Sequence, residues 1–535
     1  MKFEEYFSFE AIVGDLIRWR VKSKGIANEN GRRDVAKVLP ARKAWSRARA
    51  KVRKGVDPDV VRRQSIWRTV MRECGSVGEC CQCGNVASTN VASCQLRWVE
   101  NLKRLVNDVQ KAVFSGKVVF QKPRMIKIPK GYKNGVQEFR DVASFDSLVD
   151  RVILRRTTAY VRDVLEGVLG DCCYSFRRDS ERSHQLAIAR LQEWRKEQSA
   201  KPMYVAECDI RKFFDNISHD VVRRRWREVG FNAAAEKVLE AYLDVYETEP
   251  NRGLPQGGSF STVLANLVLA AADDAVAKVD DGRLFYARYC DDVVFVHPDA
   301  EMCRRAMSAY ECALSGLDLP MHPVQPFTYR PLDGMPTAYY EIKSKGPFQW
   351  RHPEAGEENC APWVSFLGSQ VRYDGETRIR KESIEKHIHA LGRETAKAVA
   401  AIQKCEEAGL LKKHLPPAAA KVLRECFARF RNRLIAKGVG YVTAKVKDCH
   451  LCWAGAFTRV SDCAETRMQM RRLDHVREGM LCKVWRMLCG AVSYDKRTSR
   501  RYKGRPFSYY GFLEKATRPT NMAYRRRMRL PYSEL

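Results

Sequence analysis

This sequence has no long apolar run, lacks a leader-like pattern at its start, and has few acidic residues for its number of basic ones. No apolar run approaches the roughly 18 residues that a bilayer span needs, so no membrane partner is expected. Residues 1–7 lack the charged-then-apolar order of a secretory leader, and a cytoplasmic location is expected. Asp and Glu number 64 against 95 Lys and Arg, which gives a net charge of +31. This imbalance favours a polyanionic partner, above all nucleic acid.

Closely spaced cysteine pairs are also few. The 19 cysteines are scattered over 535 residues, a distribution typical of buried thiols in a reducing compartment. Cys80 and Cys83 resemble one half of a zinc site, and Cys74 and Cys94 could complete four thiolate ligands. The spacings fit no standard zinc pattern, so a thiol-rich loop without metal is the competing interpretation.

The chain is long enough for several domains, and 45% hydrophobic residues indicate a globular protein. Residues 1 to about 110 are basic, and their pattern predicts mainly helices. Residues 42–53 alternate apolar residues with Lys and Arg, which is typical of a basic amphipathic helix. Such a helix would either face an RNA backbone or present a solvated surface.

The central stretch of the chain is residues 283–296, where two adjacent carboxylates interrupt apolar and aromatic residues. The pattern predicts a β-hairpin with Asp291 and Asp292 at its turn. Adjacent carboxylates between buried strands are costly unless cations neutralise them. Mg²⁺, a hard cation that takes oxygen ligands and leaves room for phosphate oxygens, would suit them. An Asp-Asp turn in water is the alternative for this motif taken alone.

Two further stretches bring polar residues to strand and helix ends. Residues 204–208 predict an apolar strand that presents Asp209 beside another strand's carboxylates. Residues 252–258 form a Gly-rich turn around Gln256 that leads into a helix. Its small residues let the backbone approach a flat ligand closely, and the helix N-terminus favours a phosphate. Residues 124–130 and 138–142 predict a second hairpin from which Lys and Arg project.

These blocks, in this order, resemble a reverse transcriptase of the group II intron-like type. The similarity rests on Ala206–Ile217, Leu254–Gly257 and Tyr289–Asp292, with Phe145–Arg151 and Tyr174–His184 resembling fingers blocks upstream. Downstream, Val364–Val371 and Arg378–Ile384 resemble closing palm strands. The resemblance spans roughly residues 118 to 390. It implies an α+β right-hand polymerase: fingers and palm around an antiparallel sheet, a helical thumb, and helical basic extensions at both ends.

The resemblance also implies roles for single residues. Asp209, Asp291 and Asp292 would be catalytic and would hold two Mg²⁺ ions, or Mn²⁺, with the Ile210 carbonyl as an additional ligand. Phe214 would exclude a nucleotide 2′-hydroxyl, Gln256 would touch the incoming nucleotide, and Tyr289 would lie near the primer terminus. From the fingers hairpin, the clamp on the triphosphate would come from Lys127 or Lys130 together with Arg140.

The sequence departs from the family in two places. Cys290 stands where intron-encoded enzymes usually carry Ala, a replacement of one small residue by another. The Lys-Thr pair that commonly follows a Leu-x-Leu is missing after Leu317, and an insert is expected from about residue 331 to residue 362.

The expected domains are a basic helical extension (1–117), fingers and palm (118–385), a helical thumb (386–450) and a basic C-terminal RNA-binding region (451–535). Cys449 and Cys452, with Cys463 and His475, could suggest zinc, but their apolar helical context favours core cysteines. No further Cys-x2-Cys pair is available for the nuclease domain that mobile introns often append. In the tail, Arg525–Arg529 and several aromatic residues suit stacking on RNA, with a solvated basic tail as the alternative.

The prediction is therefore an RNA-directed DNA polymerase that binds RNA as template, dNTPs and its DNA product. The absence of a nuclease and the long extensions resemble bacterial defence-associated, "unknown-group" reverse transcriptases, which work with a dedicated non-coding RNA in antiviral immunity. The alternatives are a retron, diversity-generating or mobile-intron enzyme, template-independent or protein-primed synthesis on the same palm, and a non-catalytic RNA-binding protein.

Overall fold

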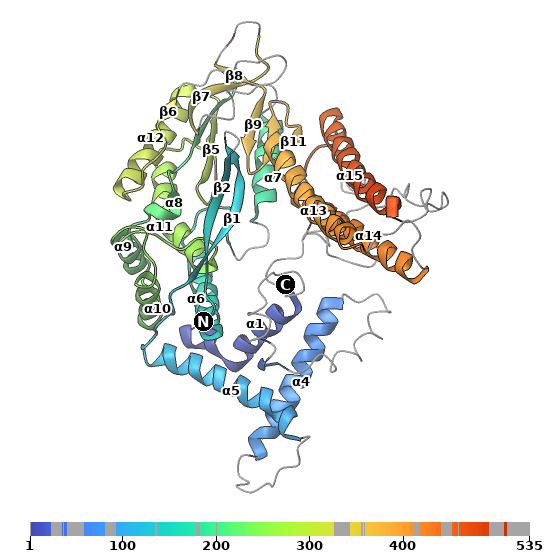
Figure 1. Cartoon of the computed structure of the whole chain (residues 1–535). Helices are drawn as coiled ribbons and strands as arrows, with labels where there is room; N and C mark the ends of the chain where they lie inside the picture. The colour runs from blue at the N-terminus through green and yellow to red at the C-terminus, as the bar shows by residue number, and fades with distance from the viewer. Residues whose placement is uncertain are drawn as a thin grey trace.

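The computed structural model describes residues 2–22, 35, 37–39, 58–80, 92–133, 136–177, 182–198, 201–325, 343–354, 357, 359–409, 417–439, 452–457, 459–491 and 508–510. The expected helix at residues 42–53 lies outside the described residues, as does the tail beyond residue 510. Figure 1 shows strands in the upper part of the molecule, long helices on one side of them, and the N-terminal helices below.

The central element is a six-stranded sheet in the order β4-β5-β3-β7-β6, with β8 paired to β7. Its strands are β3 (Tyr204–Cys208), β4 (Phe285–Tyr289), β5 (Asp292–His297), β6 (Val324–Gln325), β7 (Ser344–Trp350) and β8 (Cys360–Ala361). The first four strands of that order run antiparallel to their neighbours, whereas β6 and β8 run parallel to β7. This sheet is the antiparallel palm that the sequence predicted.

Both faces of the sheet are covered by other parts of the protein, and for this reason β5 carries consecutive apolar residues. Because side chains alternate along a strand, Val293 and Phe295 pack into one hydrophobic cluster and Val294 and Val296 into another. The first cluster includes residues of α11 (Ser259–Ala277) and α12 (Ala300–Gly316), and the second includes residues of α7 (His184–Glu197). The Ser183 side chain caps α7, as the sequence predicted, by accepting a hydrogen bond from the Leu186 amide.

Two smaller sheets flank the palm. The expected fingers hairpin is present as β1 (Arg124–Lys133) and β2 (Val136–Ser144). The expected closing palm strands are β9 (Trp363–Phe366), β10 (Ser369–Arg372) and β11 (Thr377–Ile379), and they form a separate three-stranded sheet. Their resemblance to closing palm strands stays a prediction. The palm sheet also includes β7 and β8, which lie within the stretch that was expected to be an insert, and the insert itself stays a prediction.

Three N-terminal elements pack against one helix of the palm and fingers, α6 (Leu148–Leu165), and a fourth, α4 (Pro58–Cys80), packs against α1 (Phe9–Lys22) and α5 (Ala92–Phe114). Phe3 and Tyr6 place their rings edge-on to the ring of Tyr160, at centroid distances of 4.9 and 5.5 Å. The remaining N-terminal element is η1 (Phe3–Phe7), and the other palm helices are α8 (Phe213–Asn216), α9 (His219–Val229) and α10 (Ala233–Leu243).

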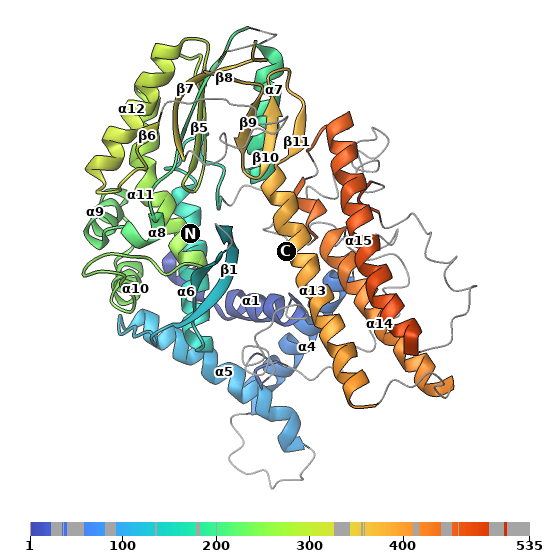
Figure 2. The same cartoon turned by 45° about the horizontal axis from the view of Figure 1, so that its top comes forward.

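The C-terminal helices α13 (Lys381–Glu407), α14 (Pro417–Gly438) and α15 (Ala464–Ala491) pack on one another, side by side in Figure 2. A short turn, η5 (Ala454–Phe457), and residues 508–510 complete this part. Tyr509 is fully buried, and its hydroxyl lies 2.6 Å from Nε2 of His387 on α13. Cys452 is buried in a hydrophobic cluster, which agrees with the expectation of a core cysteine, whereas Cys463 is buried beside the Thr466 hydroxyl. The domain boundaries remain predictions.

One described helix, α11, is long and apolar enough to cross a membrane by length and composition. The expectation that no stretch approaches that length was therefore wrong. In the structure 72% of its apolar window is buried, and α11 packs against α6, α9 and α12. It is the core helix beneath the palm sheet.

Candidate active site

Strand register brings the three predicted carboxylates to one end of the palm sheet. Cys208 of β3 pairs with Val293 of β5, so continuing the antiparallel register by one residue sets Asp209 across from Asp292. Tyr289 pairs with Asp292 across the β4–β5 hairpin, and Asp291 lies in the turn between them. The geometry therefore gathers Asp209, Asp291 and Asp292, although the role of each remains a prediction.

The carboxylates act on one another electrostatically. Burial, followed by the charges of Asp291 and Asp209, raises the pKa of Asp292 to about 7. Burial also raises the pKa of Asp291, with a further contribution from Asp209, while the charge of Arg140 acts in the opposite direction. Asp291 and Asp292 are thus harder to ionise than they would be in water, and nearby positive charge would stabilise their ionised forms.

Sequence reasoning missed one cation at this site, Lys343. Its Nζ lies 2.6 Å from Oδ2 of Asp209, and the following residue, Ser344, accepts a hydrogen bond from the Asp209 amide at 3.1 Å. Lys343 lay within the expected insert, and only a short alternation of polar and apolar residues hinted at a strand there. The charges of Lys343 and Arg380 also oppose the upward pKa shift of Asp292.

The Gly-rich turn ties the fingers hairpin to the palm. The carbonyl of Gln256 accepts a hydrogen bond from the Ala143 amide of β2 at 2.8 Å. Gly257 follows with φ +97°, and a Cβ at that position would lie 2.2 Å from Cγ1 of Val142. Glycine is needed here for both the backbone conformation and the close approach. Gln256 therefore lies at the junction of fingers and palm.

The register of the hairpin separates the predicted clamp residues. Arg140 pairs with Ile128 and Lys127 pairs with Asp141, so Arg140 and Lys127 point to opposite faces. Arg140 shares its face with Val142, which lies against Gly257, and its charge acts on Asp291. Lys130 lies at the irregularity of β1, and its charge acts on Lys386 of α13. The structure thus brings Arg140 toward the carboxylates and turns Lys127 away from that face.

The remaining predicted residues border the same region. Phe214 is half-buried in α8, its ring centroid is 5.2 Å from that of Phe213, and its carbonyl accepts a hydrogen bond from the Leu254 amide. Tyr289 is half-buried at the end of β4, with its ring centroid 5.9 Å from Phe176. Ile210 forms a backbone bridge to Met321, and its side chain is buried.

The donor set at this edge fits hard divalent cations. Its side-chain donors are carboxylate oxygens from adjacent strands, and burial together with their mutual repulsion raises the pKa of Asp292 to about 7. A divalent cation would relieve this repulsion, and oxygen ligands are those that Mg²⁺ and Mn²⁺ take. Asp209, Asp291 and Asp292, with the Ile210 carbonyl, are the residues that could hold it.

Of the four proposed zinc ligands, Cys74 alone has a described side chain. Cys74 is half-buried in α4, and burial raises the pKa of its thiol, which disfavours the thiolate that zinc needs. Cys83 lies outside the described residues, as do the side chains of Cys80 and Cys94. The zinc site therefore stays a prediction.

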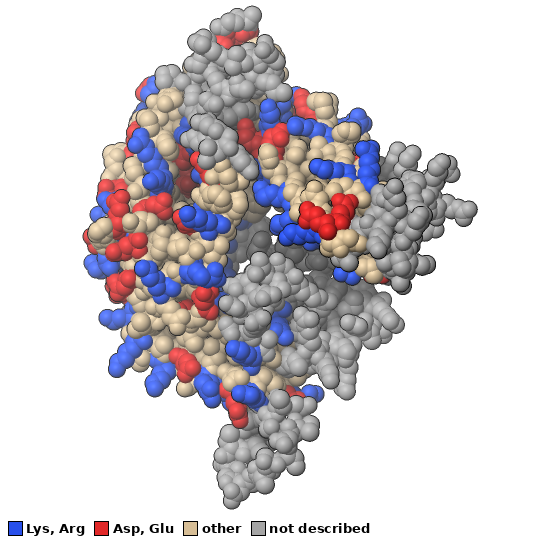
Figure 3. Space-filling model, viewed as in Figure 1, with Lys and Arg blue, Asp and Glu red and all other residues tan. Residues whose placement is uncertain are grey.

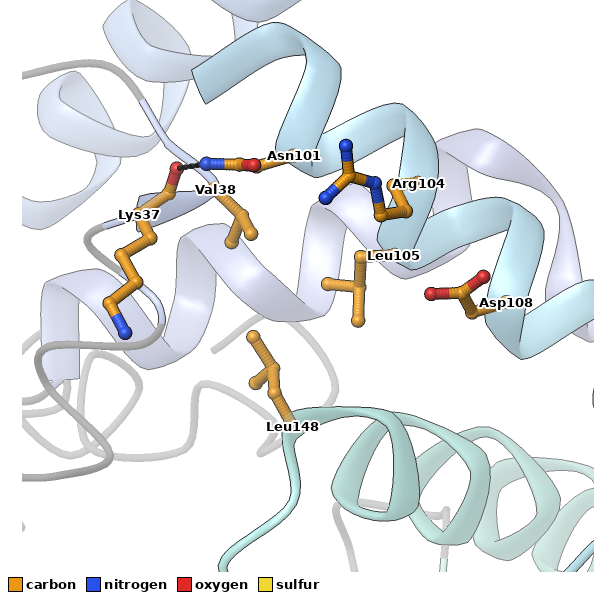
Figure 4. Close-up of a pocket in the computed structure, with 7 residues that line it drawn as sticks. All are labelled: Lys37, Val38, Asn101, Arg104, Leu105, Asp108 and Leu148. Carbon is orange, nitrogen blue, oxygen red and sulfur yellow. Dashed lines mark hydrogen bonds between the residues drawn. The ribbon is translucent and has the colours of Figure 1, made fainter. Parts of the chain in front are cut away.

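A hollow of about 250 Å³ lies between residues 37–38, α5 and the start of α6. Figure 4 shows Asn101 donating its side-chain amide to the Lys37 carbonyl there, with Leu105 and Leu148 facing the space. None of its lining residues contributes to the carboxylate cluster. On the face drawn in Figure 3, a separate opening lies near the centre, with Lys and Arg side chains on its rim.

The carboxylates, the Gly-rich turn and the antiparallel palm together define a right-hand polymerase. Residues 132–324 match the family described as reverse transcriptase (RNA-dependent DNA polymerase). That segment contains Asp209, Asp291, Asp292, Phe214 and Gln256. This segment of the chain therefore matches a reverse transcriptase domain.

Two curated proteins are similar over parts of this domain. The putative COX1/OXI3 intron 1 protein of Saccharomyces cerevisiae is 27% identical over 176 residues, covering 32% of this chain and 20% of that protein. Protein YkfC of Escherichia coli is 27% identical over 133 residues, covering 24% of this chain and 35% of that protein. The chain thus spans only about a fifth and a third of the length of these two relatives.

Solved structures of telomerase are also similar. Telomerase from Candida albicans, in complex with a fragment of telomeric RNA, has 10% identity and a TM-score of 0.33, covering 76% of this chain and 68% of that chain. Apo telomerase from Candida tropicalis has 8% identity and a TM-score of 0.35, covering 99% and 98%. A likeness this loose supports no inference about activity.

Proposed function

We propose that this chain is an active RNA-directed DNA polymerase that synthesises cDNA by two-metal phosphoryl transfer. The observation that carries the proposal is the convergence of Asp209, Asp291 and Asp292 at one end of β3 and the β4–β5 hairpin. Asp209 lies across from Asp292 in the antiparallel register, and the charges of Asp209 and Asp291 contribute to the raised pKa of Asp292. A reverse transcriptase domain around this site supplies the reaction class.

Different residues of the chain would bind the cations, the nucleotide sugar and the primer terminus. Asp209 and Asp291 would hold the cations, and Asp292 would serve one of them or support the other two carboxylates. Two divalent cations, when bound, activate the primer 3′-hydroxyl and stabilise the leaving pyrophosphate. Phe214 would set its ring against the sugar and reject a 2′-hydroxyl, and Tyr289 would support the primer terminus.

Cations around the carboxylates support a polyphosphate substrate. Arg140 from the fingers and Lys343 and Arg380 from the palm and thumb side all act on the acidic cluster. Lys386 of α13 has its pKa lowered by burial and then by neighbouring cations, among them Arg380 and Lys343. Cations that crowd one another in this way would be stabilised by the phosphates of a dNTP or of a primer strand.

The template, in this proposal, is an associated non-coding RNA, and the cDNA serves bacterial antiviral defence. The net charge of +31 supports an RNA partner. Long regions outside residues 132–324 leave room for binding a structured RNA beyond the polymerase itself. The cytoplasmic location belongs to the same proposal.

The test uses purified full-length protein with its co-purifying RNA, dNTPs and Mg²⁺. DNA whose sequence matches that RNA is expected, and the Asp291→Ala/Asp292→Ala variant should make none. Homopolymer or unmatched DNA would indicate template-independent synthesis instead. RNA binding without DNA, or equal product from the variant, would contradict the polymerase. For the defence role, cells that carry the wild type should resist phage better than cells that carry the same variant; equal infection would refute it.

A further inference from the structure

A fully buried ion pair lies directly behind the carboxylate hairpin. Arg288 of β4 has 0% exposure, and Asp273 of α11 has 4%. The guanidinium grips the carboxylate with two bonds, from Nε to Oδ1 at 2.7 Å and from Nη2 to Oδ2 at 2.5 Å. Asp273 Oδ1 also accepts a hydrogen bond from the hydroxyl of Tyr286 at 2.7 Å. The carboxylate is thus held by donors from two positions of the strand that leads into the active-site turn.

A contribution to the stability of the fold does not by itself explain why this ion pair is buried. Removing both charges from water is costly, and apolar residues of similar volume often stabilise a core equally well. A guanidinium that forms two hydrogen bonds to one carboxylate fixes the orientation of the arginine side chain, whereas an apolar contact does not.

The remaining guanidinium nitrogen leads to the turn. Nη1 of Arg288 donates to the Cys290 carbonyl at 3.3 Å and to Oδ1 of Asn266 at 3.0 Å. On the other side of the same residue, the Cys290 amide donates to the Ser175 hydroxyl at 2.9 Å. Ser175 is held by Asn266, which accepts from its hydroxyl at 2.9 Å and donates to its carbonyl at 2.7 Å. The backbone N–H and C=O of Cys290 both have partners in this one network.

Cys290 needs such support because its backbone is strained. Its φ is +60°, in the left-handed region that residues other than glycine seldom adopt. This conformation directs the chain into Asp291 and Asp292, the next two residues. If Cys290 relaxed to negative φ, both carboxylates would change direction.

We propose that Arg288, Asp273, Asn266 and Ser175 form a positioning network that holds the strained Cys290 turn and thereby sets the direction of Asp291 and Asp292 toward divalent cations. This inference rests on the proposed function, because it assumes that these carboxylates bind cations. All four residues are buried, so they act through the backbone of Cys290.

The test measures Mn²⁺ binding by titration calorimetry on folded, full-length protein, with polymerisation as a second readout. Arg288→Lys keeps the charge opposite Asp273 but loses the fork that also reaches Cys290, so the Kd for Mn²⁺ should rise roughly 10- to 100-fold. Its kcat should fall while the KM for dNTP changes little. Arg223→Lys is the matched control, since Arg223 also grips a carboxylate with two bonds, to Glu240 between α9 and α10. The control should bind Mn²⁺ as the wild type does.

Ser175→Ala keeps the test decisive if Arg288→Lys does not fold. It removes the acceptor of the Cys290 amide and the hydroxyl that donates to Asn266, and it should weaken Mn²⁺ binding by roughly tenfold. Unchanged Mn²⁺ affinity in a folded Arg288→Lys or Ser175→Ala variant would overturn the network. Wild-type protein that binds Mn²⁺ no better than an Asp291→Asn/Asp292→Asn variant would overturn the proposed function itself, and the network with it.

Discussion

Replacing Gly257 with Ala tests how the fingers hairpin is attached to the palm. The new Cβ would lie 2.2 Å from Cγ1 of Val142, and the backbone would keep φ +97°. A left-handed residue with a side chain costs about 1–2 kcal/mol, and overpacking typically costs about 1–3 kcal/mol. The native contact would thus become less favourable by roughly 2–5 kcal/mol in total. The hairpin can escape most of this cost by moving away from the turn.

That movement would break the hydrogen bond from Ala143 to the Gln256 carbonyl and carry Arg140 away from the carboxylates. We therefore expect the KM for dNTP to rise about tenfold or more, since each tenfold corresponds to about 1.4 kcal/mol. Amides of β2 should also exchange with deuterium faster than in the wild type.

Gly282→Ala is the matched control. Gly282 also has positive φ, +84°, but a Cβ there would meet nothing within 4 Å. It should lose about 1–2 kcal/mol of unfolding free energy and keep its KM for dNTP. Denaturant titration and steady-state kinetics on both variants separate backbone strain from the clash. If Gly257→Ala matched Gly282→Ala in KM and in hydrogen exchange, the hairpin would not depend on this contact.

Three further predictions follow from the same structure. Phe214→Val should admit rNTPs at least tenfold better relative to dNTPs, measured as a ratio of kcat/KM; an unchanged ratio would remove Phe214 from the sugar site. Lys343→Met, which deletes the cation 2.6 Å from Asp209, should lower kcat at least tenfold with little change in melting temperature, and full activity would contradict its placement. Burial, then the charges of Lys437 and Arg477, lowers the pKa of His387 to about 4. Since an unfolded His titrates near pH 6.5, stability should be complete above that value and fall by about 2 kcal/mol by pH 5. A His387→Phe variant should show a shallower loss in thermal melts over this range, whereas an equal slope would assign the effect elsewhere.

The site elements with local sequence signals could be predicted from the sequence. The β4–β5 hairpin, the strand that ends before Asp209 and the helix after the Gly-rich turn all appear where periodicity and turn residues placed them. These features depend on neighbouring residues alone, so their positions can be inferred without knowing the tertiary contacts.

The parts that depend on long-range pairing could not be predicted in the same way. Lys343 reaches Asp209 because β7 pairs with β3 across 138 to 145 residues of sequence, and no local pattern specifies that partner. The β9–β11 strands resemble the family's closing palm strands, and in the described part of the chain they pair only with one another. The contact between Arg288 and Asp273 likewise requires knowing how α11 lies beneath β4. The sequence shows that a residue is charged, but it does not show which buried residue forms an ion pair with it.

The most direct test of the central claim compares the wild type with Asp291→Asn, a change of nearly equal volume that removes one carboxylate charge. With co-purifying RNA, dNTPs and Mg²⁺, the wild type should make cDNA complementary to that RNA. The variant should bind the same RNA with unchanged affinity and make at least about a hundredfold less DNA, as expected when a stabilising charge is removed from a catalytic site. Equal cDNA from both proteins would contradict the assignment of these carboxylates as the polymerase active site.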